Sequence, residues 1–123
     1  MQDQKFSFKA RFKSIQFALS GLVALIKTEH NVRVHLIATV FVVISGFIFH
    51  IDSNEWLALV IAIAFVLISE IFNTVVELIC DYISPGQDAR IGMIKDMAAG
   101  AVLVSAIVAM IIGVIIFLPK IYC

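Results

Sequence analysis

The stretch MAAGAVLVSAIVAMIIGVIIFL, residues 97–118, decides the fold class, because it runs for 22 residues without a charged side chain and stops at Pro119. About 20 apolar residues are enough for an α-helix to cross a bilayer, so this stretch predicts a membrane-spanning helix. The whole chain agrees: 62% of its 123 residues are hydrophobic, 15% are charged and its mean hydropathy is +1.06. A soluble domain of this length cannot bury so much apolar surface.

Two further apolar segments precede this one. Residues 56–80 follow a polar turn at residues 52–55 and begin with Trp56, an aromatic ring suited to the bilayer interface. Residues 34–51 are apolar apart from His35 and His50. Three spans and one surface segment use nearly all of the chain, so we predict an all-α membrane protein that forms one domain over residues 1–123.

Residues 5–27 have the pattern of an amphipathic helix. The polar side of the helical wheel holds Lys5, Lys9, Lys13, Gln16, Ser20 and Lys27, and the apolar side holds Phe8, Phe12, Ile15, Leu19, Leu22 and Ile26. We expect this helix to lie in the membrane interface and to bend into the first span at the polar residues 28–33. Arg11 lies on the apolar side, where it either snorkels to water or reaches into a site.

Basic residues set the expected orientation. Eight of the nine Lys and Arg side chains lie in the N-terminal segment or in residues 81–95, which we predict to be a loop around the helix breakers Ser84, Pro85 and Gly86. The turn at 52–55 has none, and Lys120 lies at the C-terminus. By the positive-inside rule, the N-terminus and the 81–95 loop face the cytoplasm and the C-terminus lies outside.

The second span carries an acidic polar stripe. Glu70, Asn73, Thr74, Glu77 and Asp81 recur at helical spacing, so all five lie on one face of a helix. At 1.5 Å per residue from Trp56, Glu70 lies about 21 Å into a hydrocarbon core of about 30 Å, and Glu77 lies near its far boundary.

A carboxylate at the depth of Glu70 costs roughly 2.5 kcal/mol or more on insertion scales, so Glu70 is a functional candidate. The alternative is a protonated Glu70 that makes one interhelical hydrogen bond. Because three thin helices cannot enclose Glu70 from lipid on all sides, we also expect the chain to oligomerise.

A second group of charged residues forms at the cytoplasmic boundary. Glu29, Lys95 and Asp96 lie at the ends of the first and third spans, at the depth of Glu77 and Asp81. Mg²⁺ is usually bound by one or two carboxylates with waters and phosphate oxygens, and a Lys neutralises phosphate as a point charge. The pattern predicts a site for Mg²⁺ and phosphate, with simple interface anchoring as the alternative for Lys95.

Other ligand patterns are weak in this sequence. His35 and His50 each stand alone, without a second His or Cys at ligand spacing, so we expect no zinc or haem site and interpret both side chains as interfacial. The chain has no P-loop or other Gly-rich phosphate fingerprint. A nucleotide site must therefore be built in another way.

These motifs resemble one family. Residues 70–81, EIFNTVVELICD, and residues 95–102, KDMAAGAV, are similar to the bacterial diacylglycerol kinase and undecaprenol kinase family of small integral membrane lipid kinases. The resemblance spans almost the whole chain and includes residues 11–12, 21–22 and 29–31. Asn31, His35, Ser84 with Pro85, and the small residues 98–101 resemble the undecaprenol kinase branch.

The resemblance implies a homotrimer in a bacterial cytoplasmic membrane, with sites shared between neighbouring subunits. It implies that MgATP phosphorylates the hydroxyl of diacylglycerol or undecaprenol at the cytoplasmic surface, with Glu70 and Asn73 as catalytic residues and Glu70 as the general base. Glu29 and Glu77 are then expected to hold Mg²⁺ with its nucleotide, and Lys95 and Asp96 to contact the nucleotide. Ala99 is expected to border the lipid with Glu70, because small residues leave room for a headgroup, with close helix packing as the alternative role of residues 98–101.

The chain departs from the family pattern near the nucleotide. The first-helix Arg of the family corresponds to Arg11 with a shift of one residue, its aromatic partner is Phe17, and a common loop His is replaced by Asp88. The resemblance implies nucleotide contacts at Arg11 and Phe17 and in the loop at Gly86, Gln87 and Asp88.

Two readings from other classes compete with the kinase. A cation or proton conduit would use Glu70 and Glu77 as relay groups, but the outer half of every span is apolar. A structural adaptor would explain the surface helix and leave the acidic stripe unexplained. We expect no nucleic-acid partner, and the residues leave the choice between diacylglycerol and undecaprenol open.

Overall fold

The computed structural model describes residues 6–86 and 88–122, which form four helices: α1 (Phe8–Thr28), α2 (His30–Ile48), α3 (Ser53–Ile83) and α4 (Ala89–Ile121). The predicted all-α class is confirmed. Helices α2, α3 and α4 are each long and apolar enough to cross a membrane. The predicted positions of Lys5 and Gln87 lie outside the described residues.

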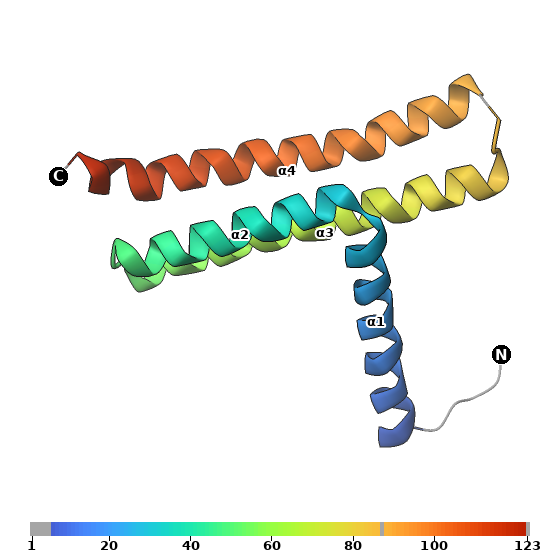
Figure 1. Cartoon of the computed structure of the whole chain (residues 1–123), viewed down its shortest axis with the longest axis horizontal. Helices are drawn as coiled ribbons and strands as arrows, with labels where there is room; N and C mark the ends of the chain where they lie inside the picture. The colour runs from blue at the N-terminus through green and yellow to red at the C-terminus, as the bar shows by residue number, and fades with distance from the viewer. Residues whose placement is uncertain (1–5, 87, 123) are drawn as a thin grey trace.

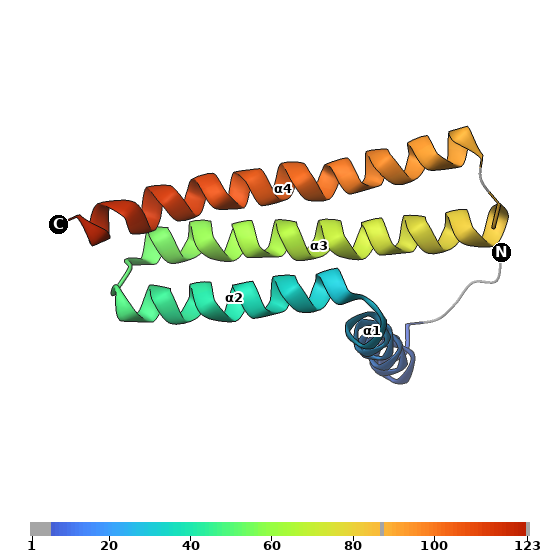
Figure 2. The same ribbon diagram turned by 45° about the horizontal axis from the view of Figure 1, so that its top comes forward.

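The three long helices lie side by side, with α3 between α2 and α4 (Figure 2). Helix α1 turns away from them at Glu29 and runs crosswise to the bundle (Figure 1). Glu29 has an extended backbone, with φ −105° and ψ 112°, so the chain breaks its helix there for one residue. The bend predicted within residues 28–33 is confirmed, and none of the residues of α1 is buried.

Two ion pairs fix the register of the antiparallel helices α3 and α4. Lys95 Nζ lies 2.6 Å from Asp81 Oδ1, and Lys120 Nζ lies 3.1 Å from Glu55 Oε1 at the other end. Ala99 follows Lys95 by four residues, so it is level with Glu77, which precedes Asp81 by four. Glu70 lies seven residues deeper along α3, about 10 Å further into the bundle.

Helix α3 begins earlier than the predicted turn at residues 52–55 allows. Asp52 caps the helix by accepting a hydrogen bond from the Glu55 amide at 2.9 Å, and Glu55 Oε1 accepts one from the Asp52 amide at 3.0 Å. This reciprocal pair is a capping box, which satisfies amides that the first helical turn leaves open. Ser53 to Glu55 are therefore helical, and the prediction that they form a turn is wrong.

The predicted loop at residues 81–95 is also too long. Helix α3 continues to Ile83, just before Ser84 and Pro85, and α4 starts at Ala89 with Asp88 as its N-cap. A residue that precedes Pro disfavours helical geometry, which explains the stop. Asp81 and Lys95, both predicted to lie in the loop, are on α3 and α4 and pair with each other.

Helix α4 passes through Pro119 instead of ending there. It reaches Ile121, and the Tyr122 amide still donates a hydrogen bond to the Leu118 carbonyl at 3.4 Å. Pro lacks one amide hydrogen and costs one helical hydrogen bond, and the Lys120–Glu55 ion pair holds the last turn against α3. The predicted stop at Pro119 is therefore wrong for the helix.

Helix α2 is about as long as the hydrocarbon core is thick, whereas α3 and α4 are much longer. Helix α2 has 19 residues, while α3 has 31 and α4 has 33. At 1.5 Å per residue these are about 28, 46 and 50 Å, against a hydrocarbon core of about 30 Å. Because α2 and α3 are joined by a short turn at one end, the excess length of α3 and α4 projects at the other end, where α1 leaves.

Candidate active site

The deeper part of the predicted polar stripe of α3 is buried inside a single protomer, whereas Glu77 is half-buried and Asp81 is exposed. Glu70, Asn73 and Thr74 have only 3%, 7% and 4% of their surface exposed. They are the buried polar residues of the part of the chain that the structure describes. Buried polar groups in a membrane helix need partners, and three contacts supply them.

The first contact joins two helices. His35 Nε2 of α2 lies 3.5 Å from Glu70 Oε2 of α3. The interpretation of His35 as a lone interfacial side chain is therefore wrong, because the fold brings it against the deepest carboxylate. The contact holds Glu70 toward α2.

The other two contacts follow the helical repeat of α3. Thr74 Oγ1 donates to the Glu70 carbonyl at 3.1 Å, and Asn73 Nδ2 donates to Glu77 Oε1 at 3.3 Å. Asn73 Oδ1 is buried and has no hydrogen-bond partner among the described residues. An acceptor that is buried without a donor costs about 1–3 kcal/mol, which favours a donor or cation from outside the protomer at this position.

Glu29 reaches the same region from the junction of α1 and α2. It is the N-cap residue of α2, yet its side chain makes no capping hydrogen bond. The Glu29 carboxylate makes no hydrogen bond or ion pair among the described residues. The charges of Glu77 and Glu29 act on Glu70, and His35 contacts it, so these groups from two helices and their junction form one cluster.

The remaining candidate site residues, Lys95 and those of the α3–α4 loop, lie at the end of the bundle where α3 and α4 project beyond α2. Lys95 pairs with Asp81 and is also within electrostatic range of Glu77. A cavity of about 540 Å³ adjoins Lys95 and is lined by Gly86, Asp88, Ala89, Ile91, Gly92 and Lys95. Three residues predicted to contact nucleotide, Gly86, Asp88 and Lys95, thus surround one cavity. Asp96, the residue after Lys95, is exposed but does not line this cavity.

The sequence matches a known enzyme family. The profile described as prokaryotic diacylglycerol kinase matches residues 16–117, which include the acidic stripe, Glu29, His35 and Lys95. The chain belongs to this family. It is 34% identical to undecaprenol kinase of Bacillus subtilis strain 168 over 97% of both chains. It is also 34% identical to diacylglycerol kinase of Synechocystis sp., over 86% of this chain and 61% of that one.

Membership of the prokaryotic diacylglycerol kinase family makes this chain a lipid kinase, a phosphotransferase with an alcohol acceptor. The resemblance stated from residues 70–81 and 95–102 is confirmed. Such an enzyme needs a base for the hydroxyl and positive charge for the phosphates. Both kinds of group occur at one end of its bundle.

The residues of this kinase fit Mg²⁺ bound together with a nucleotide. Within the described ranges, no three or more His, Cys, Asp or Glu side chains cluster closely enough to hold a metal by themselves. Mg²⁺ does not require this, since it commonly takes one or two carboxylates and fills its octahedron with water and phosphate oxygens. Suitable oxygen ligands are the carboxylates of Glu77 and of Glu29, whose side chain makes no capping hydrogen bond, and Asn73 Oδ1, which has no partner among the described residues.

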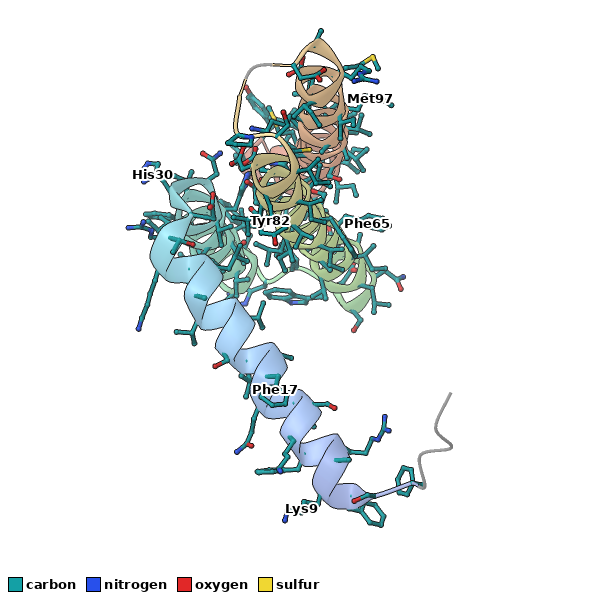
Figure 3. All side chains as sticks on the ribbon, turned by 90° about the vertical axis from the view of Figure 1, so that its right-hand side faces the viewer. Lys9, Phe17, His30, Phe65, Tyr82 and Met97 are labelled. Carbon is teal, nitrogen blue, oxygen red and sulfur yellow. The ribbon has the colours of Figure 1, made fainter. Side chains whose placement is uncertain are left out.

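Three residues named from the resemblance are not brought to this cluster within one protomer. Arg11 and Phe17 are exposed on α1, which points away from the bundle; Figure 3 shows Phe17 well outside it. The Arg11 guanidinium lies 5.9 Å from the ring centre of Phe6. Ala99 is exposed on α4, level with Glu77 and about 10 Å along the axis from Glu70.

The argument that only an oligomer can enclose Glu70 is wrong. One protomer leaves 3% of Glu70 exposed, because α2 lies against the polar face of α3 and supplies His35. Burial of Glu70 therefore gives no evidence on the oligomeric state.

Proposed function

We propose that this protein transfers the γ-phosphoryl group of ATP to the hydroxyl of undecaprenol at the cytoplasmic face of a bacterial inner membrane. The single observation that carries this proposal is the buried Glu70 on the stripe that continues to Glu77 and Asp81, at the projecting end of the bundle. A lipid hydroxyl can meet Glu70 from the membrane, while a nucleotide reaches the opposite end of the stripe from water.

Glu70 is the proposed general base. Its carboxylate would accept the proton of the lipid hydroxyl as the oxygen attacks the γ-phosphorus, which is a step that a positioned side chain accelerates. Asn73, one turn away, holds Glu77 through its amide at 3.3 Å. Helix α3 therefore fixes the base and the metal-binding carboxylate in one register.

The groups proposed to neutralise the phosphate charges of ATP lie at the end of the bundle where α3 and α4 project beyond α2. Glu29 and Glu77 would hold Mg²⁺, with Asn73 Oδ1 as a further candidate oxygen ligand, and the ion would supply positive charge opposite the phosphates. Lys95, next to the cavity bordered by Gly86 and Asp88, would bind phosphate, and Asp96 would lie at the nucleotide. Phosphoryl transfer needs mainly positioning and charge neutralisation, so no separate nucleotide-binding fold is required.

The proposed assembly is a homotrimer with its N-terminus and α3–α4 loop in the cytoplasm. In this arrangement α1 lies on the cytoplasmic leaflet as an amphipathic surface helix, and its Arg11 and Phe17 serve the nucleotide site of a neighbouring subunit. The crosswise direction of α1 and its lack of buried residues support this placement (Figure 1).

Undecaprenol is preferred over diacylglycerol as the proposed acceptor for two reasons. The match to the Bacillus subtilis undecaprenol kinase covers 97% of each chain, whereas this chain spans 61% of the Synechocystis diacylglycerol kinase. Asn31, His35, Ser84 and Pro85 also follow the undecaprenol kinase branch. Purified protein in mixed micelles should show a higher kcat/KM for undecaprenol than for diacylglycerol, and the reverse order would reject this choice.

The test of the proposed base is Glu70→Gln. The amide keeps the volume of the side chain and removes its ability to accept a proton, so turnover with either lipid should fall by roughly 10² to 10⁴, the range for a positioned general base. Binding of a nucleotide analogue and the oligomeric mass should not change. Glu55→Gln, at the far end of the same helix, is the matched control. Near-normal turnover by folded Glu70→Gln would show that the base lies elsewhere.

A further inference from the structure

The His35–Glu70 contact links a buried group to a more open one. The Glu70 side chain is 4% exposed, while that of His35 is 27% exposed. Their atoms Oε2 and Nε2 are 3.5 Å apart, slightly longer than a hydrogen bond. Catalytic hydrogen bonds are often long without substrate and shorten when it binds. The imidazole therefore lies between the carboxylate and the surroundings of the protomer.

A buried general base must release the proton that it has accepted. Transfer of a phosphoryl group from ATP to an alcohol releases one proton in each turnover, and Glu70 must lose it before it can act again. The other charged groups that act on Glu70 are Glu77 and Glu29, which the proposed function commits to Mg²⁺. Helix α4 offers no alternative at this depth, since residues 97–118 include no ionisable side chain.

We propose that His35 positions Glu70 and carries its proton outward, an inference that rests on the proposed role of Glu70 as base. As the lipid oxygen bonds to the γ-phosphorus and the bridging bond to ADP breaks, the hydroxyl proton passes to Glu70. The imidazole proton of His35 then exchanges through water from Nε2 to Nδ1, and Nε2 accepts the proton of the Glu70 carboxyl. The resulting imidazolium releases the proton on Nδ1 to water, which leaves Nε2–H donating to the Glu70 carboxylate as in the starting state.

Two substitutions of His35 distinguish its positioning of Glu70 from its transfer of a proton. His35→Gln can still donate a hydrogen bond to Glu70 but cannot carry a proton, and His35→Ala can do neither. Both should lower kcat by roughly 10- to 100-fold, less than loss of the base itself. The KM values for ATP and lipid should stay within about twofold, since His35 is assigned no substrate contact. Added imidazole should restore the kcat of His35→Ala and leave that of His35→Gln unchanged.

The control is His50→Gln, in the turn that follows α2, beyond the end of that helix opposite to His35. It should have unchanged kcat. A wild-type kcat in His35→Gln, or a loss in His35→Ala that imidazole does not reverse, would overturn the inference. If His35→Ala does not fold, the kcat of His35→Gln alone decides.

Glu70→Gln measured in parallel separates this inference from the proposed function. An inactive Glu70→Gln with a fully active His35→Gln would reject the role of His35 and keep Glu70 as base. An active Glu70→Gln would reject the base and, with it, any proton path from Glu70.

Discussion

Asn73 and Glu77 lie one turn apart on α3, and the hydrogen bond between them orients the Glu77 carboxylate. The amide of Asn73 binds Glu77 Oε1 at 3.3 Å and leaves Oε2 available, while its own Oδ1 is buried without a partner in the described residues. Each of these oxygens is of the kind that binds Mg²⁺. This arrangement leads to a test of the metal assignment.

Glu77→Gln and Glu29→Gln should each raise the Mg²⁺ concentration needed for activity. Each change removes one negative ligand and leaves the other, so the rate should be partly recovered at high Mg²⁺. At low Mg²⁺ the loss should be at least the roughly 10- to 100-fold seen when outer partners of metal sites are removed. Glu55→Gln, whose carboxylate pairs with Lys120, should keep the wild-type Mg²⁺ titration. An unchanged titration in both test variants would withdraw the metal roles.

Residues on one helix could be predicted from the sequence, and contacts between helices could not. Glu70, Asn73, Thr74 and Glu77 share a face because the helical repeat is local. The contact of His35 depends on how α2 packs against α3, which no local spacing encodes. A signal was present: His35 and Glu70 both lie well along their helices from the turn that joins α2 to α3, so they have similar depth in the membrane.

At the scale of the elements, the turn between α2 and α3 depends on the close approach of Gly46 to the ring of Trp56. Gly46 is buried, and the ring of Trp56 occupies the space where a Cβ would lie: an added Cβ would be 2.6 Å from Cη2 of Trp56. Phe47 packs on the same ring, with centroids 4.8 Å apart. Together with the capping box of Asp52 and Glu55, this contact fixes α2 on α3 at the end opposite the site.

Gly46→Ala should therefore lower the thermal unfolding midpoint of the detergent-solubilised protein. Overpacking costs about 1–3 kcal/mol, which outweighs the gain of roughly 1 kcal/mol from replacing Gly by Ala in a helix. Adding Trp56→Phe should recover part of the loss by freeing the space. Gly113→Ala, where an added Cβ meets no atom within 4 Å, should not lower the midpoint. Equal behaviour of the two single variants would contradict this account.

The ends of the helices were less predictable than their presence. Hydropathy finds the part of a helix that lies in hydrocarbon, so it missed the helical residues at both ends of α3 and at the start of α4, where polar side chains reach water. The sequence D-S-N-E at residues 52–55 contained the capping box and could have indicated the start of α3. Pro119 was misleading because a Pro in the last turns removes one hydrogen bond without ending a helix that is paired elsewhere.

At the scale of the whole molecule, the protomer does not assemble every residue that the family resemblance assigns to the nucleotide. Glu29, Glu77 and Lys95 are at the projecting end of the bundle, whereas Arg11 and Phe17 are on α1, directed away from it (Figure 3). A crosswise helix of 21 residues extends about 30 Å, far enough to reach a second subunit. These features support a site that two subunits complete.

Subunit mixing tests this arrangement. One variant combines Arg11→Ala with Phe17→Ala and lacks the α1 contribution; the other, Glu77→Gln, lacks the bundle contribution, and each alone should have low activity. After dissociation and joint reassembly at equal amounts, about a quarter of shared sites should combine an intact α1 with an intact Glu77, because neighbours in a ring are drawn at random. Activity should then rise to roughly that fraction of the wild type. Reassembly of each variant alone is the control, and a mixture that stays as inactive as its components would show that each protomer builds its own site.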